Sequence, residues 1–540
     1  MQLLLKLFGS WVQFFYFSFD RVVLHGHLTF FQLEGNVVAF FRNLLGVPVL
    51  SKEVLAKRTE EYNRWVVAFA RNQKCPLEWA QPGQRKEDYV RPTLERRRAR
   101  QRFGVYFILM SMEQGPSFRI SLPKFPTGDP NYRILRAQRS RYRHYYFYIY
   151  DQQLGAFCLR VGSFLPFPVT AYVNGHEFIA RQLTRRNIHF TQRDNSFTDV
   201  ADVKALQAAA DRFGPSVLRW VLNYWALAVG PKFSKKERRA CQGLSRFWAV
   251  QQIEYCLNFI FKRNWPIRRL FERCCELSLY LIGADRIGQL FGARAHRRIH
   301  GKLQNVMERL DHGMHVFRAY WKHSFLKQYE KWRTFLRLEV VCNRLRDFGL
   351  NKGLADWDLM RTRFRDVLDR FAQHQAVSLN VHGELDLLAR LAQPVQLGQT
   401  KIAGIKLEQR RLMRLLEVLL RRAGGGFGGW TVPQVQAAIL DTFNLKAADY
   451  SLHAVRYDLR KLRAHGLLER IPHTYRYRLT LKGQKAATLL TLLRKRIYGP
   501  IAAATFQHRP AAQPTPNSPF ERAYAKVDHA LDELLLALAA

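Results

Sequence analysis

The sequence predicts a multidomain protein of the α+β class. Short runs rich in β-branched and aromatic residues, separated by Gly and Pro, predict an α/β part at the N-terminus. Apolar residues spaced three and four apart predict a largely helical middle, which contains one β-hairpin. Further on, three helix-like segments followed by two short strand-like segments predict a compact C-terminal domain. A chain of 540 residues has room for roughly two to four domains.

Changes in composition and periodicity set the expected boundaries. The first residues are apolar but lack a basic start and a small-residue cleavage site, so we expect a packed or extraneous leader and a cytoplasmic protein. The expected parts are an apolar leader (1–19), a basic and aromatic α/β domain (20–200), a mainly helical domain (201–395) with a hairpin (324–343), a linker (396–405), a C-terminal domain (406–496), and an Ala/Pro-rich link with a short helix (497–540).

Within the first two domains, individual elements follow from local patterns. Alternating or β-branched runs predict strands, and spacings of three and four predict helices. The expected strands are 103–110, 144–151, 156–161 and 169–173, and the expected helical stretches are 175–186, 217–221, 253–261 and 357–392.

The charge points to a polyanionic partner. The chain has 86 Lys and Arg against 43 Asp and Glu, a formal net charge of +43. Nucleic acid is the commonest large polyanion in a cell, so we expect it as the partner, with DNA favoured and RNA as an alternative. A merely soluble basic surface and a membrane surface are the other interpretations.

Two arginine-rich runs lie in the N-terminal domain, at 85–102 and 133–143. The second run leads into a Tyr-rich strand, and cations beside aromatic rings suit a single strand or RNA as well as duplex DNA. Both runs could equally be solvated faces of helices. The arginines chosen as candidate contacts are Arg96, Arg97, Arg98, Arg139, Arg141 and Arg143.

The C-terminal domain carries the clearest signals. Residues 407–422 predict a helix, and Thr431 and Ser451 are suitable N-caps for two more, which end near Phe443 and Ala464. Gly466 follows the third helix in the position of a C′ glycine. Strands at 467–471 and 475–480 form an expected hairpin, and another helix starts at Lys482. Residues 406–496 hold 19 basic and 6 acidic residues by count.

The third helix of this domain is expected to contact nucleic acid. Its apolar stripe consists of Leu452, Val455, Leu459 and Leu462. Polar and basic residues then occupy the opposite side, as in helices that enter the major groove. Together with two arginines of the hairpin, the candidate contacts are His453, Arg456, Tyr457, Arg460, Lys461, Arg463, Arg476 and Arg478.

The segment 451–483 resembles the MarR and ArsR type of winged helix-turn-helix domain. The resemblance rests on S-x-x-A-V-R-Y-D-L-R-K-L-R-A-H-G-L-L-E-R followed by Y-R-Y-R-L-T-L-K-G. It implies a winged-helix fold over about a sixth of the chain and, for many such domains, DNA binding. Domains of this type also serve in protein contacts, so a homodimer through this domain or through the last helix is a further expectation.

The hairpin at 324–343 is the best lead to chemistry. Tyr329-Glu-Lys, followed by Leu336-Arg-Leu-Glu339, resembles the Y-D-K…L-R-x-E hairpin of rolling-circle replication initiators. The resemblance implies that Glu339 supports a metal ion and that a tyrosine, with Tyr329 the candidate here, attacks the scissile phosphate. Glu330 stands where that family has Asp, and the only His-x-His is at 25–27. A structural alternative is that Arg337 and Glu339 are present because Arg337 forms a buried ion pair near Glu339, without any role in catalysis.

Other chemical sites receive weaker support. Carboxylates that converge on a metal pair define another kind of nuclease site, and the candidates are Asp20, Glu113, Asp151 and Asp194. His296 and His300 share a helix face but lie among arginines, and the seven cysteines lack zinc-type spacing, so we expect no metal ligands among them. There is no Walker or dinucleotide motif, so we expect no ATPase, no NAD enzyme and no small-molecule cofactor.

Two classes of function remain open. The first is a non-enzymatic nucleic-acid-binding protein of a mobile element, replicon or regulatory system. The second is a nicking or cutting enzyme, dependent on Mg²⁺ or Mn²⁺ and targeted by the C-terminal domain. The position of Glu339 discriminates between them: a second carboxylate at metal-sharing distance favours the enzyme, whereas pairing with an arginine alone favours the binding protein.

Overall fold

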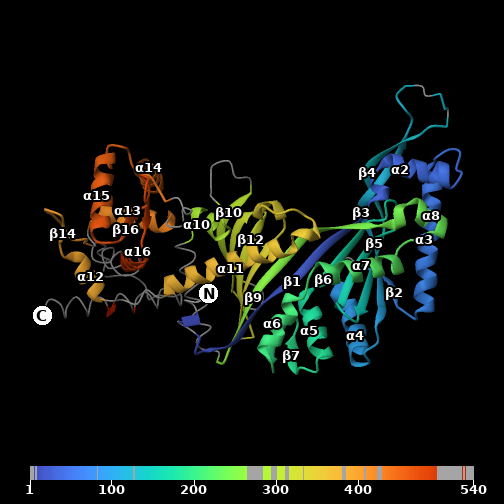
Figure 1. Cartoon of the computed structure of the whole chain (residues 1–540), viewed down its shortest axis with the longest axis horizontal. Helices are drawn as coiled ribbons and strands as arrows, with labels where there is room; N and C mark the ends of the chain where they lie inside the picture. Colours follow the sequence, from blue (N-terminus) through green and yellow to red (C-terminus); the bar gives the residue numbers. More distant parts are fainter. Residues whose placement is uncertain are drawn as a thin grey trace, which may run out of the picture. The chain divides into compact units, whose positions relative to one another are not determined.

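The computed structural model shows a mixed α/β protein with a large sheet (Figure 1). The chain divides into two compact units: the first holds Phe8–Cys275 and Arg298–Phe371, and the second holds Glu276–Arg297 and Ala372–Ala540. The residues described are 5–6, 9–81, 83–84, 86–125, 128–129, 131–263, 282, 284–293, 301–309, 315–332, 334–379, 385–406, 409–422, 429–494, 526 and 529–530.

The first unit is built on one sheet whose described strands number 11, in the order β10-β11-β12-β13-β9-β1-β6-β5-β4-β3-β2. Every neighbouring pair is antiparallel except β2 and β3. The strands are β1 (Val12–Leu28), β2 (Leu77–Trp79), β3 (Gly104–Ser121), β4 (Ile134–Asp151), β5 (Gly155–Gly162), β6 (Val169–Asn174), β9 (Arg246–Phe261), β10 (Lys302–Arg309), β11 (His315–Lys322), β12 (Ser324–Lys331) and β13 (Phe335–Cys342).

Strand β1 corrects the expected boundaries. The expected leader at 1–19 includes the first half of β1, which pairs with β9 in the middle of the sheet, so it belongs to the fold. The expected division near residue 200 is also wrong, because β9 to β13 complete the sheet begun by β1 to β6. The middle of the chain is therefore not a mainly helical domain. The expected hairpin at 324–343 is present as β12 and β13.

The expected helix at 253–261 is wrong, because this segment lies inside β9. Strand β9 has neighbours on both sides and is buried on both faces over most of this stretch. A strand buried in this way reads as a continuous apolar run, which periodicity does not separate from a buried helix. The expected strands at 144–151, 156–161 and 169–173 lie within observed strands, and the expected strand at 103–110 lies within β3 except for Phe103.

Helices cover the central strands on one face. In α11 (Trp357–Leu379), Trp357 packs against Phe19 of β1 with ring centroids 4.5 Å apart, and Phe364 packs against Tyr255 of β9. Strand β6 ends at Asn174, opposite Arg21, so none of the described strands pairs with the first half of β1 on that side. Its neighbours there include α5 (Gly175–Arg185), α6 (Val203–Asp211) and the hairpin of β7 (Phe190–Arg193) and β8 (Ser196–Val200).

The second unit contains a helical cluster with two small hairpins among its described residues. Its elements include α12 (Leu385–Ala392), β14 (Val395–Leu397), β15 (Thr400–Ile402), α13 (Arg410–Arg422), α14 (Val432–Phe443), α15 (Leu452–Ala464), β16 (Leu468–Arg470), β17 (Tyr477–Leu479) and α16 (Leu481–Leu493). The expected linker at 396–405 is wrong, since β14 and β15 form a hairpin there.

The helix ends of this unit follow from their caps. Ser451 Oγ accepts a hydrogen bond from the Ala454 amide at 3.3 Å, and Thr431 begins α14 with a capping box to Gln434. Gly466 has φ +71°, the left-handed conformation that a C′ glycine adopts without strain. Of the expected apolar stripe of α15, Val455, Leu459 and Leu462 are in the core, whereas Leu452 is exposed. Among the described residues, no helix has both the length and the apolar character needed to cross a membrane.

Candidate functional site: three carboxylates and two basic surfaces

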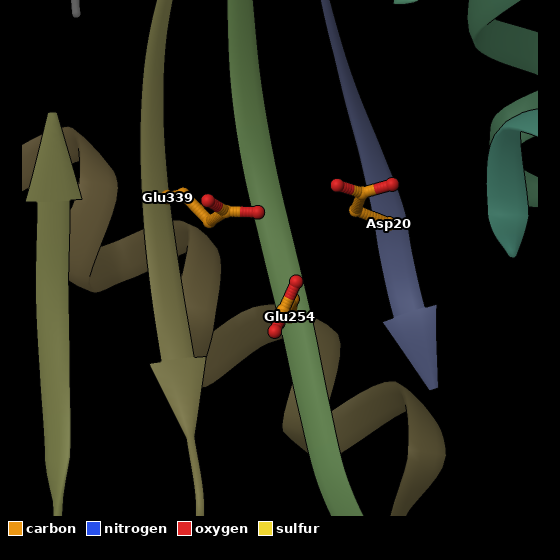
Figure 2. A group of neighbouring side chains, drawn as sticks. All are labelled: Asp20, Glu254 and Glu339. Carbon is orange, nitrogen blue, oxygen red and sulfur yellow. The ribbon is translucent and has the colours of Figure 1, made fainter. Parts of the chain in front are cut away.

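Three carboxylates meet on one face of the central strands. Asp20 comes from β1, Glu254 from β9 and Glu339 from β13, and one oxygen of each lies within 4.8 Å of the others. Figure 2 shows the three side chains pointing toward one another across β9. Strands far apart in the sequence therefore bring together three acidic groups that share no local motif.

The sheet register places these residues on one face. Glu339 is opposite Cys256, and Glu254 lies two residues before Cys256, so both side chains project to the same side of the sheet. In β1 the register shifts between Phe19 and Val22, an irregularity that includes Asp20. Bulges of this kind re-aim side chains, and they are common next to functional sites.

Asp20 is held in its ionised form by its partners. The guanidinium of Arg337 lies 2.9 Å from Asp20 Oδ2, and His176 Nδ1 lies 3.2 Å from Oδ1. Asn195 Nδ2 also donates to Oδ2. Burial opposes ionisation of Asp20, but Arg337 and His176 outweigh it and hold the pKa below its usual range. The pKa of His176 is lowered by burial, so the imidazole is neutral at pH 7 and orients Asp20.

Glu339, unlike Asp20, is buried without close hydrogen-bonding partners among the described residues. Its side chain is 1% exposed, and among the described residues no group donates a hydrogen bond to either carboxylate oxygen. The ammonium of Lys327 is 3.5 Å from Oε2, which is an ion pair longer than a good hydrogen bond. Burial and the charge of Asp20 raise the pKa of Glu339, although Lys327 lowers it. A buried carboxylate without hydrogen bonds calls for an explanation.

Glu254 is the most accessible of the three. It is partly exposed, and Gln252 donates a hydrogen bond to its Oε1 at 3.2 Å. Burial, followed by the charges of Glu339 and Asp20, raises its pKa to about 8. Like charges this close disfavour full ionisation, so Glu254 retains its proton at neutral pH unless a cation joins the group.

This grouping fits a divalent cation. Mg²⁺ and Mn²⁺ prefer carboxylate oxygens, and three oxygens within 4.8 Å of one another are close enough to share one ion. Binding would displace the remaining protons and give the Glu339 oxygens a closer partner than the Lys327 ammonium at 3.5 Å. Arg337 and Lys327 reduce the net charge of the group, which favours one ion over two. The candidate ligands are carboxylates, whereas the histidines and cysteines were expected to provide no metal ligands.

The sequence singled out two of the three residues. Glu339 came from the hairpin pattern and Asp20 from a set of scattered acids, whereas Glu254 was missed because its strand was expected to be a helix. The other acids of that set lie elsewhere: Glu113 pairs with Lys86 and Arg160, and Asp151 accepts a hydrogen bond from Trp225 Nε1. Asp194 lies between β7 and β8 and is not part of the cluster.

Tyr329 lies beside the cluster without the properties of an activated nucleophile. It pairs with Arg337 in the register of β12 and β13, and its side chain is buried. Burial and the charge of Glu339 raise the pKa of the hydroxyl well above its usual value. His25 and His27 lie on β1, and burial lowers the pKa of both. His296 and His300 lie outside the described residues.

The exposed side of α15 forms one basic surface. The residues of this helix that were expected to contact nucleic acid are exposed, with one correction: Lys461 is 4% exposed and donates to Gln409 Oε1 at 2.9 Å. Lys461 lies between Leu459 and Leu462 on the helix, so the aliphatic part of its side chain is buried in the core. The exposed residues are His453, Arg456, Tyr457, Arg460 and Arg463.

The hairpin of β16 and β17 carries two further candidates, both with internal partners. Arg478 is exposed and pairs with Glu469, the residue opposite it in the register. Arg476 is half-buried and donates to the carbonyl oxygen of Gly429 at 3.1 Å. Because these two arginines have internal partners, the exposed basic side chains of α15 are more available to an anion than those of the hairpin.

The N-terminal arginines form another basic surface. The run at 85–102 lies largely on α4 (Lys86–Ala99), where Arg98 pairs with Glu177 while Arg96 and Arg97 form no ion pair with described residues. The run at 133–143 lies largely on β4, so the alternative of a helix face is wrong for it. Among the described residues, no ion pair involves Arg139, Arg141 or Arg143.

Comparisons of the chain with protein-family models, with curated proteins and with solved structures found no match.

Proposed function

We propose that this protein is a nucleic-acid-binding enzyme that cleaves phosphodiester bonds with a divalent cation held by Asp20, Glu254 and Glu339. The observation that carries the proposal is the Glu339 carboxylate, which is buried in an acidic group, forms a long ion pair with Lys327 at 3.5 Å, and accepts no hydrogen bond of good geometry from the residues that the structure describes. The net charge of +43 supports a polyanionic substrate. Mg²⁺ or Mn²⁺, when bound, would polarise a phosphate oxygen and stabilise charge in the transition state.

The residues around the cation have separate tasks in this proposal. Glu254, as the partly exposed ligand, faces the solvent side through which a phosphate reaches the site. Arg337 and His176 hold Asp20 in place and ionised. In the reaction, water adds across a P–O bond and yields a phosphomonoester and a free hydroxyl, with no oxidant or reductant involved. The raised pKa of Tyr329 favours water over a tyrosine as nucleophile.

The C-terminal unit has the role of targeting the enzyme to DNA. The order of three helices, a hairpin and a fourth helix supports a winged-helix domain at 410–493, with α15 in the major groove. Its exposed Arg456 and Arg460 are the proposed base contacts, since arginine suits bidentate contact with guanine. DNA is favoured over RNA because the deep, narrow major groove of A-form RNA excludes such a helix.

The test uses the purified full-length chain with single-stranded and double-stranded DNA and RNA. We expect cleavage with Mg²⁺ or Mn²⁺, no cleavage with EDTA, and loss of cleavage in Glu339→Gln and Asp20→Asn. Glu78→Gln, which changes an exposed strand glutamate, is the matched control. Circular dichroism and thermal unfolding establish that each variant is folded. Cleavage that persists in a folded Glu339→Gln variant would refute the assignment.

A non-catalytic nucleic-acid-binding protein is the second candidate. The exposed basic face of α15 favours it, because this surface requires no chemistry at the sheet. Binding without cleavage of every substrate and with either metal would support this candidate against the enzyme. Isothermal titration with Mn²⁺ separates the two further, since only the enzyme proposal requires a metal site that Glu339→Gln abolishes.

A further inference from the structure

The outer half of the β3–β4 hairpin extends beyond its neighbours. Residues 144–151 of β4 pair with β5, and residues 108–110 of β3 pair with β2. Among the described strands, residues 111–121 and 134–143 pair only with each other, and we call this two-stranded segment the ribbon. Figure 1 shows β3 and β4 continuing past β5 into a loop near α2 (Glu34–Ala39).

The ribbon is anchored at its side, and Glu113, its one acidic residue, is already paired with Lys86 and Arg160. Phe118 and Leu135 are buried in an apolar cluster with Phe31 and Phe41, which fixes its direction. Residues 114–143 contain seven basic residues and one acidic residue, Asp129, by count. The charge of Asp129 is taken by an ion pair with Arg42.

The arginines of the ribbon form a ladder. Arg139, Arg141 and Arg143 alternate along β4, so they share one face of the strand at intervals of about 7 Å. Arg119 lies directly opposite Arg136 in the register, and both are exposed. Like charges opposite each other destabilise a sheet unless an anion lies between them. Among the described residues, no carboxylate forms an ion pair with these five arginines, and a polyanion would supply the missing negative charge.

The end of the ribbon exposes apolar side chains. Leu122 is 70% exposed and Phe125 is 80% exposed, and Tyr132 on the returning segment is also exposed. Proteins that kink DNA insert such side chains, Phe and Leu among them, between base pairs and unstack them. A two-stranded ribbon that carries cations along its length and apolar residues at its end combines the two features that this kind of binding requires.

We infer that the ribbon binds duplex DNA and bends it, with Arg139, Arg141 and Arg143 on the phosphates and with Leu122 and Phe125 inserted at a base step. The inference rests on the proposed function in that nucleic acid is the partner, but it involves neither the carboxylates nor α15. Duplex DNA is the occupant because unstacking requires paired bases and because B-form grooves admit a ribbon.

Bending is measured by energy transfer between dyes at the two ends of a duplex of about 30 base pairs. We expect the full-length protein to shorten the end-to-end distance, consistent with a kink of about 20–90°. The double variant Leu122→Ser with Phe125→Ser should still bind but lose most of the change in energy transfer. Leu359→Ser alters an exposed leucine of α11 and is the matched control.

The salt dependence of binding tests the arginine ladder. The triple variant Arg139→Gln, Arg141→Gln and Arg143→Gln should lower the slope of log K against log salt by about 2 to 3, since each phosphate contact contributes about 0.9. The control replaces three exposed arginines elsewhere in the unit, Arg64, Arg212 and Arg219, by Gln. An unchanged slope in the ladder variant, or a slope lowered equally by the control, would overturn the assignment.

The outcomes separate this inference from the proposed function. If the wild-type protein binds duplexes without bending them, or if the Leu122 and Phe125 double variant bends them fully, the ribbon inference is wrong while the proposed function stands. If the ribbon variants lose bending but keep Mn²⁺ binding and cleavage of a short single strand, both stand. If the wild-type protein binds no nucleic acid, both are wrong.

Discussion

Arg337 Nη1 lies 2.9 Å from Asp20 Oδ2 in an ion pair that is buried at both ends. The rest of the guanidinium is also occupied, by Asn258 Oδ1 at 2.7 Å and by Ser196 Oγ at 2.8 Å. A buried charge is stable only when it is paired and hydrogen-bonded, and this one joins three strands to the hairpin of β7 and β8. The ion pair therefore stabilises the sheet and also holds Asp20 in position next to Glu254 and Glu339.

Removal of Arg337 should destabilise the protein strongly. Arg337→Met leaves the buried Asp20 carboxylate without its cation, and breaking one side of a buried pair costs about 3–5 kcal/mol. Urea unfolding of the first unit measures the loss. The double variant with Asp20→Asn removes both charges and should recover part of it. If the double variant is as unstable as the sum of the single variants, the pair is not coupled.

The stability of the metal-free protein should fall as the pH rises from about 5 to 8. The pKa of Glu254 is about 8 in the folded protein against 4.5 for an ordinary Glu, so the folded state holds more protons in this range. Stability decreases with pH wherever the folded state binds more protons than the unfolded chain. Thermal unfolding in EDTA at several pH values measures the trend, and Glu254→Gln should flatten it. A rising trend would contradict the raised pKa.

Divalent metal should reverse this trend. Because the cation binds deprotonated carboxylates, its affinity should increase with pH up to about 8, and it should raise the melting temperature most at the alkaline end. Titration with Mn²⁺ in two buffers of different ionisation enthalpy reports the protons released. Glu339→Gln should abolish the effect, whereas Glu78→Gln should not. Stabilisation that persists in Glu339→Gln would place the metal elsewhere.

The exposed arginines of α15 should contribute to DNA binding one by one. Arg456→Ala and Arg460→Ala should each weaken binding to a preferred site by about 1–3 kcal/mol if they contact bases. Fluorescence anisotropy with labelled duplexes measures the affinity, and Arg64→Ala, an exposed arginine of the first unit, is the control. Unchanged affinity in both α15 variants would exclude this helix as the contact surface.

Asp458 should stabilise the second unit. It is buried, and it accepts hydrogen bonds from Arg411 at 2.7 and 3.0 Å and from the Tyr450 hydroxyl at 2.7 Å. Asp458→Asn removes the charge that Arg411 contacts and should cost about 1–3 kcal/mol. Because half of the Arg411 side chain is exposed, Arg411→Met should cost less. Denaturant unfolding measures the free energy of unfolding of each variant, and the loss should be larger for Asp458→Asn than for Arg411→Met.

Local patterns were sufficient for much of the second unit. Caps at Thr431 and Ser451 and a glycine at 466 set helix ends that the structure reproduces, because capping depends on residues within one turn of each other. The hairpin of β12 and β13 followed equally from alternation along its strands. In each of these cases the interacting residues are neighbours in the sequence.

The sequence by itself determined the basic charge and the helices around α15, and it identified Glu339 as a candidate metal ligand. Only the tertiary structure decided that residues 12–20 form the centre of a sheet, that β9 is a strand, and that Glu254 joins Asp20 and Glu339. The physical reason is the distance along the chain. A strand buried on both faces has no distinctive periodicity, and its partners are chosen by pairing over more than 200 residues, which no local pattern records.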